Sequence, residues 1–310
     1  AISSQRNIAQ QEGKVQEAQT ETNLYQVRRR VNEMYFSLLL LNEQIQLNED
    51  VKALLLSSEK KLSAMVKGGT AATSDLDNVR AERLSVEQQN ESLKQQKQML
   101  QRMLSVFCGI EVNKIQKPEP IQVTSSANNR PEMRLYDSQL KLTEAKEKAL
   151  DTQLCPKLGL FAQGYYGYPG LNMFEDMMNR KWSLNGIVGI KLSWNVSALY
   201  IRKNDKAKLN AQRGMIESAR EVFLFNNKLE EIQQSENITR YQTMMKSDDE
   251  IIVLRKNVRK AAESKLAHGI IDVNSLLREI NNENAAKTQL TIHEIDMLKE
   301  MYNLKYTNNE

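Results

Sequence analysis

One long stretch near the start of this sequence contains no residue that ends a helix. Residues 14–67 include neither glycine nor proline, and apolar side chains recur through them at alternating steps of three and four. This spacing places the apolar residues on one stripe of an α-helix and is typical of a coiled-coil seam. The stripe consists of Leu24, Val27, Val31, Met34, Leu38, Leu41 and Ile45. A helix of this length, about 80 Å at ~1.5 Å per residue, cannot bury its stripe alone.

A glycine turn separates this helix from a second one. Residues 68–75 read GGTAATSD, in which the glycines suit a helix C-terminus and Ser74 or Asp75 can cap the next helix. The second helix, residues 75–107, keeps apolar residues at seven-residue intervals, namely Val79, Val86, Leu93, Leu100 and Phe107. Two long helices joined by a short turn predict an antiparallel hairpin over residues 1–108.

The same order of helix, glycine turn and helix returns in the second half. A very long helix is predicted over residues 198–268, Gly269 interrupts it, and a last helix follows over residues 272–306. A shift of 197 residues aligns the two halves and matches Asp75 with Asp272, with a first turn about three residues longer than the second. The sequence therefore predicts an internal repeat with a second hairpin over residues 198–310.

The segment between the hairpins has a different pattern. Residues 109–129 predict an irregular linker, and residues 130–154 predict a short helix. Over residues 155–197, two stretches alternate apolar and polar residues, which predicts two β-strands joined by a loop at residues 169–181. Aromatic residues lie near the strand ends: Tyr165, Tyr166, Tyr168, Trp182 and Trp194. The predicted fold class is therefore mainly α, with long antiparallel coiled-coil hairpins in two repeats and a small β-hairpin.

Composition and motifs exclude several classes of function. The formal net charge of +4 comes from interspersed acidic and basic residues, so nucleic-acid binding is not indicated. His268 and His293 lie far apart, and Cys108 and Cys155 form no CxxC pair, so we expect no metal. Phosphate-binding loops and catalytic motifs are absent, which argues against an enzyme and against a cofactor. The densest apolar run, residues 34–41, is too short for a membrane-spanning helix.

In their order along the chain, these motifs resemble the TolC-like outer-membrane efflux channel family, the outer membrane factors. GGTAATSDLDNVRAERLS resembles the first hairpin tip of that family, and GIIDVNSLLREIN is similar to the second. The helix that leads to a strand beginning at Pro156 resembles the approach to the family's membrane strands. The second strand departs from the pattern, because Trp194-Asn195-Val196 stands where an aromatic residue is usually followed by Asp-Gly-Gly. The resemblance covers nearly the whole chain.

The resemblance implies a passive exit duct rather than an enzyme. It implies a homotrimer in a Gram-negative bacterium, with strands that form one barrel in the outer-membrane lipid and helices that form a tunnel in the periplasm. The partners would be a periplasmic adaptor and an inner-membrane pump, in a tripartite efflux or type I secretion system. We expect the full-length protein to have a signal peptide and a further strand pair before Ala1. The sequence leaves an N-terminal lipid anchor and the transported substrate open.

The resemblance also implies two sets of site residues. Carried over by position, Ser74, Asp75, Asp272 and Ser275 would line the periplasmic aperture. The two aspartates also suit the simpler role of helix caps. The five aromatic residues named above would form interfacial belts on a membrane hairpin, with Trp182 and Trp194 at opposite interfaces.

The alternation of the second strand assigns its two faces. Val188 and Ile190 would face lipid, whereas Asn185, Lys191 and Ser193 would face the lumen. The alternative is an amphipathic hairpin packed on helices, in a soluble periplasmic coiled-coil scaffold or adaptor protein with a small β-domain.

Overall fold

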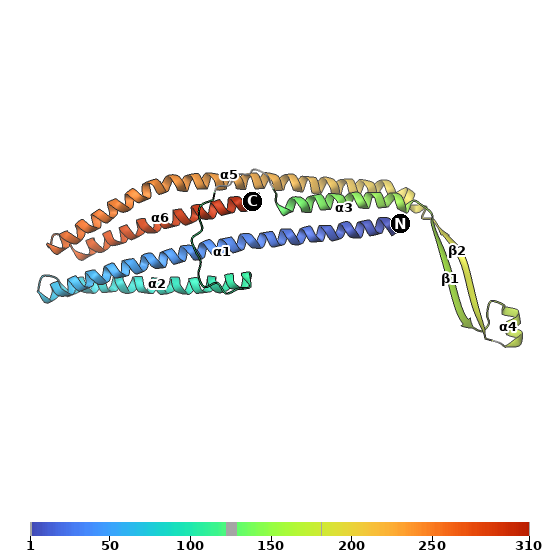
Figure 1. Cartoon of the computed structure of the whole chain (residues 1–310), viewed down its shortest axis with the longest axis horizontal. Coiled ribbons are helices and arrows are strands. Elements are labelled where there is room, and N and C mark those ends of the chain that lie inside the picture. Colours follow the sequence, from blue (N-terminus) through green and yellow to red (C-terminus); the bar gives the residue numbers. More distant parts are fainter. Residues whose placement is uncertain (1, 122–128, 181, 310) are drawn as a thin grey trace. The chain divides into compact units, whose positions relative to one another are not determined.

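Helices account for most of the chain. The computed structural model describes residues 2–121, 129–180 and 182–309 (Figure 1). In chain order the elements are α1 (Ile2–Lys67), α2 (Thr73–Cys108), α3 (Pro131–Gln153), β1 (Lys157–Gly167), α4 (Met173–Asn179), β2 (Ser183–Ser193), α5 (Ser197–Ala267) and α6 (Val273–Asn308). The predicted fold class is confirmed. The predicted loop at residues 169–181 differs in one respect, because it contains the short helix α4.

The chain divides into two units. Unit 1 comprises Ala1–Glu21 and Pro131–Val222, and unit 2 comprises Thr22–Arg130 and Phe223–Glu310. Unit 1 therefore holds α3, the strand pair and α4. Unit 2 holds α2, α6 and the turns that close both long hairpins.

The two hairpins match each other at a constant offset of 200 residues. The first helices end at Lys67 and Ala267, and the second helices begin at Thr73 and Val273. Both second helices are 36 residues long. The two turns are therefore equal in length, and the predicted offset of 197 with a longer first turn is wrong.

A glycine in the left-handed conformation ends the first helix of each hairpin. The φ angle is 73° at Gly69 and 69° at Gly269. In the first turn the Gly69 amide donates to the Val66 carbonyl at 3.1 Å, and the Thr70 amide donates to the Met65 carbonyl at 2.9 Å. The equivalent bonds of the second turn are 3.0 and 2.9 Å long. These bonds form a Schellman motif, which satisfies terminal carbonyls and favours glycine at this position.

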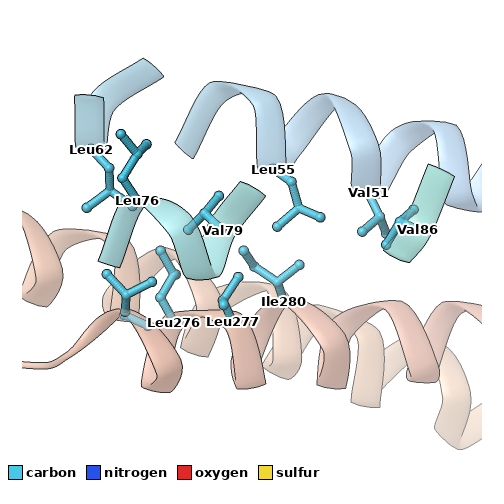
Figure 2. Packing of buried hydrophobic residues seen from close by; sticks show 11 residues of the cluster. Val51, Leu55, Leu62, Leu76, Val79, Val86, Leu276, Leu277 and Ile280 are labelled. Carbon is cyan, nitrogen blue, oxygen red and sulfur yellow. The ribbon is translucent and has the colours of Figure 1, made fainter. Parts of the chain in front are cut away.

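A buried apolar cluster lies at the tips of the two hairpins, within unit 2 (Figure 2). It joins α1 and α2 to α6, with Ala262 contributed by α5. Leu55, Val79 and Ile280 are among its fully buried side chains. The heptad positions Val79 and Val86, identified from their spacing, belong to this cluster, so the predicted stripe of α2 is buried near the tip.

Ion pairs join the two helices of each hairpin at equivalent positions but with opposite signs. In the first hairpin, Arg83 of α2 binds Glu59 of α1, with 2.9 Å between Nε and Oε2. In the second hairpin, Glu283 of α6 binds Arg259 of α5. At the offset of 200 residues, Glu59 corresponds to Arg259 and Arg83 corresponds to Glu283. The hairpins therefore use one pair of positions with the charges exchanged.

Both acidic members of these pairs are held in the ionised form. Hydrogen bonds from Arg80 and Arg83 lower the pKa of Glu59. Burial raises the pKa of Glu283, but hydrogen bonds from Lys287 and Arg259 outweigh burial, so the net pKa is lowered.

The linker after α2 is irregular over its described residues 110–121, and hydrogen bonds attach it to helices. The Val112 amide donates to the Ser105 hydroxyl at 2.9 Å, and the Tyr302 hydroxyl donates to the Glu119 carbonyl at 3.3 Å. Residues 110–121 are thereby attached to both α2 and α6.

In unit 1, α3 is tied to its helical neighbours by ion pairs. Glu147 of α3 binds Lys206 and Arg213 of α5 at 3.0 and 2.8 Å, and these hydrogen bonds lower its pKa. Lys146 lies 3.7 Å from Glu12 of α1. β1 and β2 pair antiparallel, from Lys157 opposite Ser193 to Gly167 opposite Ser183.

Candidate functional site

Asp272 is the N-cap of α6. Its Oδ1 accepts a hydrogen bond from the backbone amide of Ser275 at 2.9 Å. Hydrogen bonds from the Ser275 side chain and backbone hold the pKa of Asp272 below its usual value, and the charge of Arg278 adds a smaller effect. An ionised acceptor at this position satisfies an amide at the positive end of the helix dipole.

Asp75 does not occupy the equivalent place in the first hairpin. The N-cap of α2 is Ala72, which corresponds to Asp272, whereas Asp75 corresponds to Ser275. Asp75 Oδ2 accepts from the backbone amide of Ala72 at 3.4 Å. The matching of Asp75 with Asp272 is therefore wrong. Each aspartate supplies one of the two hydrogen bonds that together make a capping box.

The N-terminal ends of α2 and α6 lie against each other. The Asn78 side-chain amide donates to Asn274 Oδ1 at 3.5 Å, and that of Asn281 donates to Glu82 Oε1 at 2.9 Å. Leu76 joins the same apolar cluster as residues of α6. The four predicted aperture residues lie within the first turns of these two helices: Ser74, Asp75, Asp272 and Ser275.

The two arginines near the tips bind carboxylates other than those of the tip aspartates. Lys67, Arg80, Lys265 and Arg278 are the cations close to the tip aspartates in sequence. Arg80 Nε lies 2.9 Å from Glu59 Oε1, and Arg278 Nε lies 3.5 Å from Glu279 Oε1. Among the described residues, neither tip aspartate forms an ion pair. The direct hydrogen bonds to the tip carboxylates therefore come from backbone amides, with the charge of Arg278 as a smaller contribution at Asp272.

The two histidines make separate contacts. His293 is buried, with its Nδ1 2.6 Å from Asp248 Oδ2 and its Nε2 2.7 Å from the Gln289 side chain. His268 Nδ1 lies 2.7 Å from the Ser264 carbonyl. Within the described part of the chain, no group of three His, Cys, Asp or Glu side chains could hold a metal ion.

Sequence reasoning missed the pair of His293 and Asp248. A signal was present, because the two residues lie at nearly equal distances along the chain from the Gly269 turn. In an antiparallel helical hairpin, such residues lie opposite each other.

One face of the strand pair is apolar and exposed. The register places Leu160 opposite Ile190 and Ala162 opposite Val188. Val188 and Ile190 are exposed, and so are Leu158, Leu184 and Leu192 on the same face. This pairing of apolar with apolar residues follows the predicted alternation.

Asn185 lies on the same face of β2 as Lys191 and Ser193, and the loop between the strands covers its side chain. Its side chain is 8% exposed, and its Oδ1 accepts from the Leu171 amide at 2.7 Å. Beside it, Asp176 Oδ2 accepts from the Gly170 amide at 2.9 Å and from the Ser183 hydroxyl at 2.7 Å. Asn185 and Asp176 therefore fix the loop between the strands.

The predicted belt aromatics cluster at the two ends of the strand pair. Trp182 and Trp194 directly flank β2. The rings of Tyr166 and Trp182 stack with 5.8 Å between centroids, and Trp194 Nε1 donates to the Leu154 carbonyl at 3.0 Å. The Tyr168 hydroxyl donates to the Met177 carbonyl of α4 at 3.4 Å. Tyr165, like these four, is exposed.

Comparison with solved structures identifies proteins that have a similar fold. No protein-family model and no curated protein matches the sequence. Among solved structures, the outer-membrane channel OprN matches with a TM-score of 0.76 at 13% identity, over 99% of this chain and 71% of that one. The outer membrane protein VceC of Vibrio cholerae matches with a TM-score of 0.76 at 13% identity, over 97% and 74%. The CmeC outer membrane channel of Campylobacter jejuni matches with a TM-score of 0.74 at 12% identity, over 97% and 66%.

At these identities the likeness shows the fold. The chain has the TolC-like fold of outer membrane factor channels and spans about 70% of the length of these channels. The matching structures are membrane channels rather than enzymes. None of the described helices contains a segment long and apolar enough to cross a membrane.

Proposed function

We propose that the protein is the outer-membrane channel component of an export system, a passive trimeric duct of a tripartite efflux or type I secretion system. The observation that carries this proposal is the TolC-like fold, which extends over 99% of the chain in the match to the OprN channel. A passive channel requires no catalytic residues. This agrees with hairpin tips that consist of helix caps and nearby ion pairs, and with strands that have an exposed apolar face. The partners would be a periplasmic adaptor and an inner-membrane pump.

In this proposal the strand pair lies in the outer membrane. Each strand is 11 residues long, which matches the ~9–11 residues that a tilted strand needs to cross a bilayer. In lipid, every backbone group of a strand must be hydrogen-bonded, so the pair would join strands from other copies in a closed sheet. The exposed face with Val188 and Ile190 would meet lipid, and Trp182 and Trp194 would lie at opposite interfaces.

The hairpin tips would form the periplasmic aperture. Three copies of Asp75 and Asp272 around one opening would create a focused negative potential that favours cations. Ser74 and Ser275 would add polar groups beside them. Capping and selection are compatible, because a carboxylate that accepts one amide hydrogen bond keeps its charge.

Planar-bilayer recordings of the full-length protein test this proposal. We expect ion conductance with a preference for cations, and a reduced preference in the double variant Asp75→Asn, Asp272→Asn. Asparagine keeps a side-chain acceptor for each amide, so the tips should remain folded. The matched control is Asp77→Asn, which removes a carboxylate two positions away and on another face of the helix.

Each outcome of these recordings has a defined meaning. Unchanged selectivity in the double variant would place the selective region elsewhere. Absence of conductance, together with recovery of the protein in the soluble periplasmic fraction, would contradict the channel and support the scaffold alternative.

A further inference from the structure

The loop between β1 and β2 carries a short helix with an exposed apolar face. α4 spans seven residues. Its apolar side chains are 59%, 90%, 56% and 87% exposed, in the order Met173, Phe174, Met177 and Met178. At about 100° per residue, these four side chains lie within an arc of roughly 140°, and the polar residues of α4 occupy the rest.

The polar side of α4 is tied to the strand pair. Asp176 accepts from the Gly170 amide at 2.9 Å and from the Ser183 hydroxyl at 2.7 Å, and the Met177 carbonyl accepts from the Tyr168 hydroxyl. A Cβ added at Gly170 would lie 1.9 Å from Ser183 Oγ, so the loop packs closely against the end of β2. These contacts fix the polar side and leave the apolar side of α4 exposed.

The aromatic end of the strand pair lies beside this helix. The stacked rings of Tyr166 and Trp182 are next to the loop, and the Tyr168 hydroxyl donates to the Met177 carbonyl of α4. The exposed apolar face of the strands continues from Leu184 to Leu192. Tyr and Trp side chains of membrane strands occupy the interfaces, where an apolar ring and a polar tip are both satisfied.

We propose that the apolar face of α4 rests in the interfacial layer of the membrane, so that its partner is a lipid surface. This inference rests on the proposed function, because the strand pair must lie in the membrane for α4 to reach that layer. A helix with one apolar and one polar side lies in the plane of the interface, with the apolar side chains at the boundary of headgroups and acyl chains. Flexible methionine side chains suit an irregular lipid surface.

Site-directed fluorescence tests the position of α4. The full-length protein, with Cys108→Ser and Cys155→Ser, is labelled with an environment-sensitive nitrobenzoxadiazole probe through Phe174→Cys and reconstituted in phospholipid vesicles. The matched control is Asn179→Cys, on the polar side of the same helix. We expect the probe at position 174 to show blue-shifted emission and to lose intensity with spin-labelled lipids. The probe at position 179 should keep the emission of an aqueous environment.

A third labelled variant, Val188→Cys, separates this inference from the channel proposal. Lipid quenching at position 188 but not at position 174 would overturn the inference and leave the channel proposal standing. Lack of lipid quenching at both positions would contradict both. Quenching of position 174 by aqueous iodide, or its shielding from both quenchers, would show instead that α4 faces water or another protein surface.

Discussion

At the scale of single residues, the aspartates at the two tips act through backbone amides. Asp272 accepts from the Ser275 amide at the start of α6, and Asp75 accepts from the Ala72 amide at the start of α2. Their sequence context is similar, yet their positions differ by three residues relative to the glycine that ends the preceding helix. The glycine, rather than the acidic residue, is therefore the reliable landmark for aligning the two turns.

We expect the Asp272→Ala variant to lose more stability near neutral pH than in acid. Hydrogen bonds from Ser275 hold the pKa of Asp272 below its usual value. Its contribution to stability is therefore fully present above the unfolded-state pKa of about 3.9 and disappears as the pH falls through the lowered, folded-state pKa. Thermal unfolding of both proteins across this range measures the difference in Tm, which should be constant near neutral pH and close to zero at the acid end.

The control for this experiment is Asp272→Asn. Asparagine is as good an N-cap as aspartate but does not titrate, so its Tm should stay near that of the native protein at neutral pH. A loss in Asp272→Ala that persists unchanged to the acid end would contradict the role of the ionised carboxylate.

At the scale of elements, each hairpin is joined by charges that the other hairpin carries in reverse. The Arg259 and Glu283 side chains are 11% and 5% exposed, whereas those of Arg83 and Glu59 are 21% and 17% exposed. Removing one member of a buried pair leaves the other charged and without compensation, which costs more than the pair itself contributes. The second hairpin should therefore be the more sensitive to a single reversal.

We expect Arg259→Glu to lower the free energy of unfolding by roughly 3 kcal/mol, because it places a third carboxylate beside Glu263 and Glu283 in a mostly buried position. Glu59→Arg should cost less, since its partner Arg83 is more exposed. The double variant Arg259→Glu, Glu283→Arg should recover part of the loss. Urea unfolding of the native protein, Arg259→Glu, Glu283→Arg and the double variant gives the coupling free energy between positions 259 and 283. A double variant no more stable than Arg259→Glu would contradict a direct pairing.

The sequence predicted the helices and strands whose hydrophobic pattern repeats over many residues. The helices of both hairpins and the two strands repeat their pattern over many residues, and their predicted positions agree closely with the structure. α4 was missed because seven residues contain only two turns, too few to show a helical period beside the loop-forming asparagines. Alternation assigned Asn185 to one face of β2, but it could not reveal that the loop covers its side chain.

At the scale of the whole molecule, the predicted helical stripes are only partly buried. Val79 and Val86 near the tip are buried, but Leu24 is 63% exposed and Phe107 is 43% exposed. Large apolar side chains that stay exposed along a helix mark a surface for further protein. These exposed parts of the stripes agree with the proposed trimer.

We expect the full-length protein in detergent to have the mass of three chains. Multi-angle light scattering, corrected for bound detergent, measures this mass directly. Leu24→Gln should weaken the assembly, because it replaces an exposed apolar side chain of the stripe, whereas Glu250→Gln on the exposed surface of α5 should leave the mass unchanged. A stable dimer or monomer of the native protein would contradict the proposal.

The reversed ion pairs also restrict how the two halves of this gene can diverge or recombine. A recombination event that copied α2 over α6 would set Arg83 against Arg259, and the reciprocal event would set Glu283 against Glu59. Gene conversion between the halves would therefore be selected against even while their lengths and turns stay interchangeable. The two hairpins have second helices and turns of equal length, but each hairpin carries a charge pattern that matches its own partner helix.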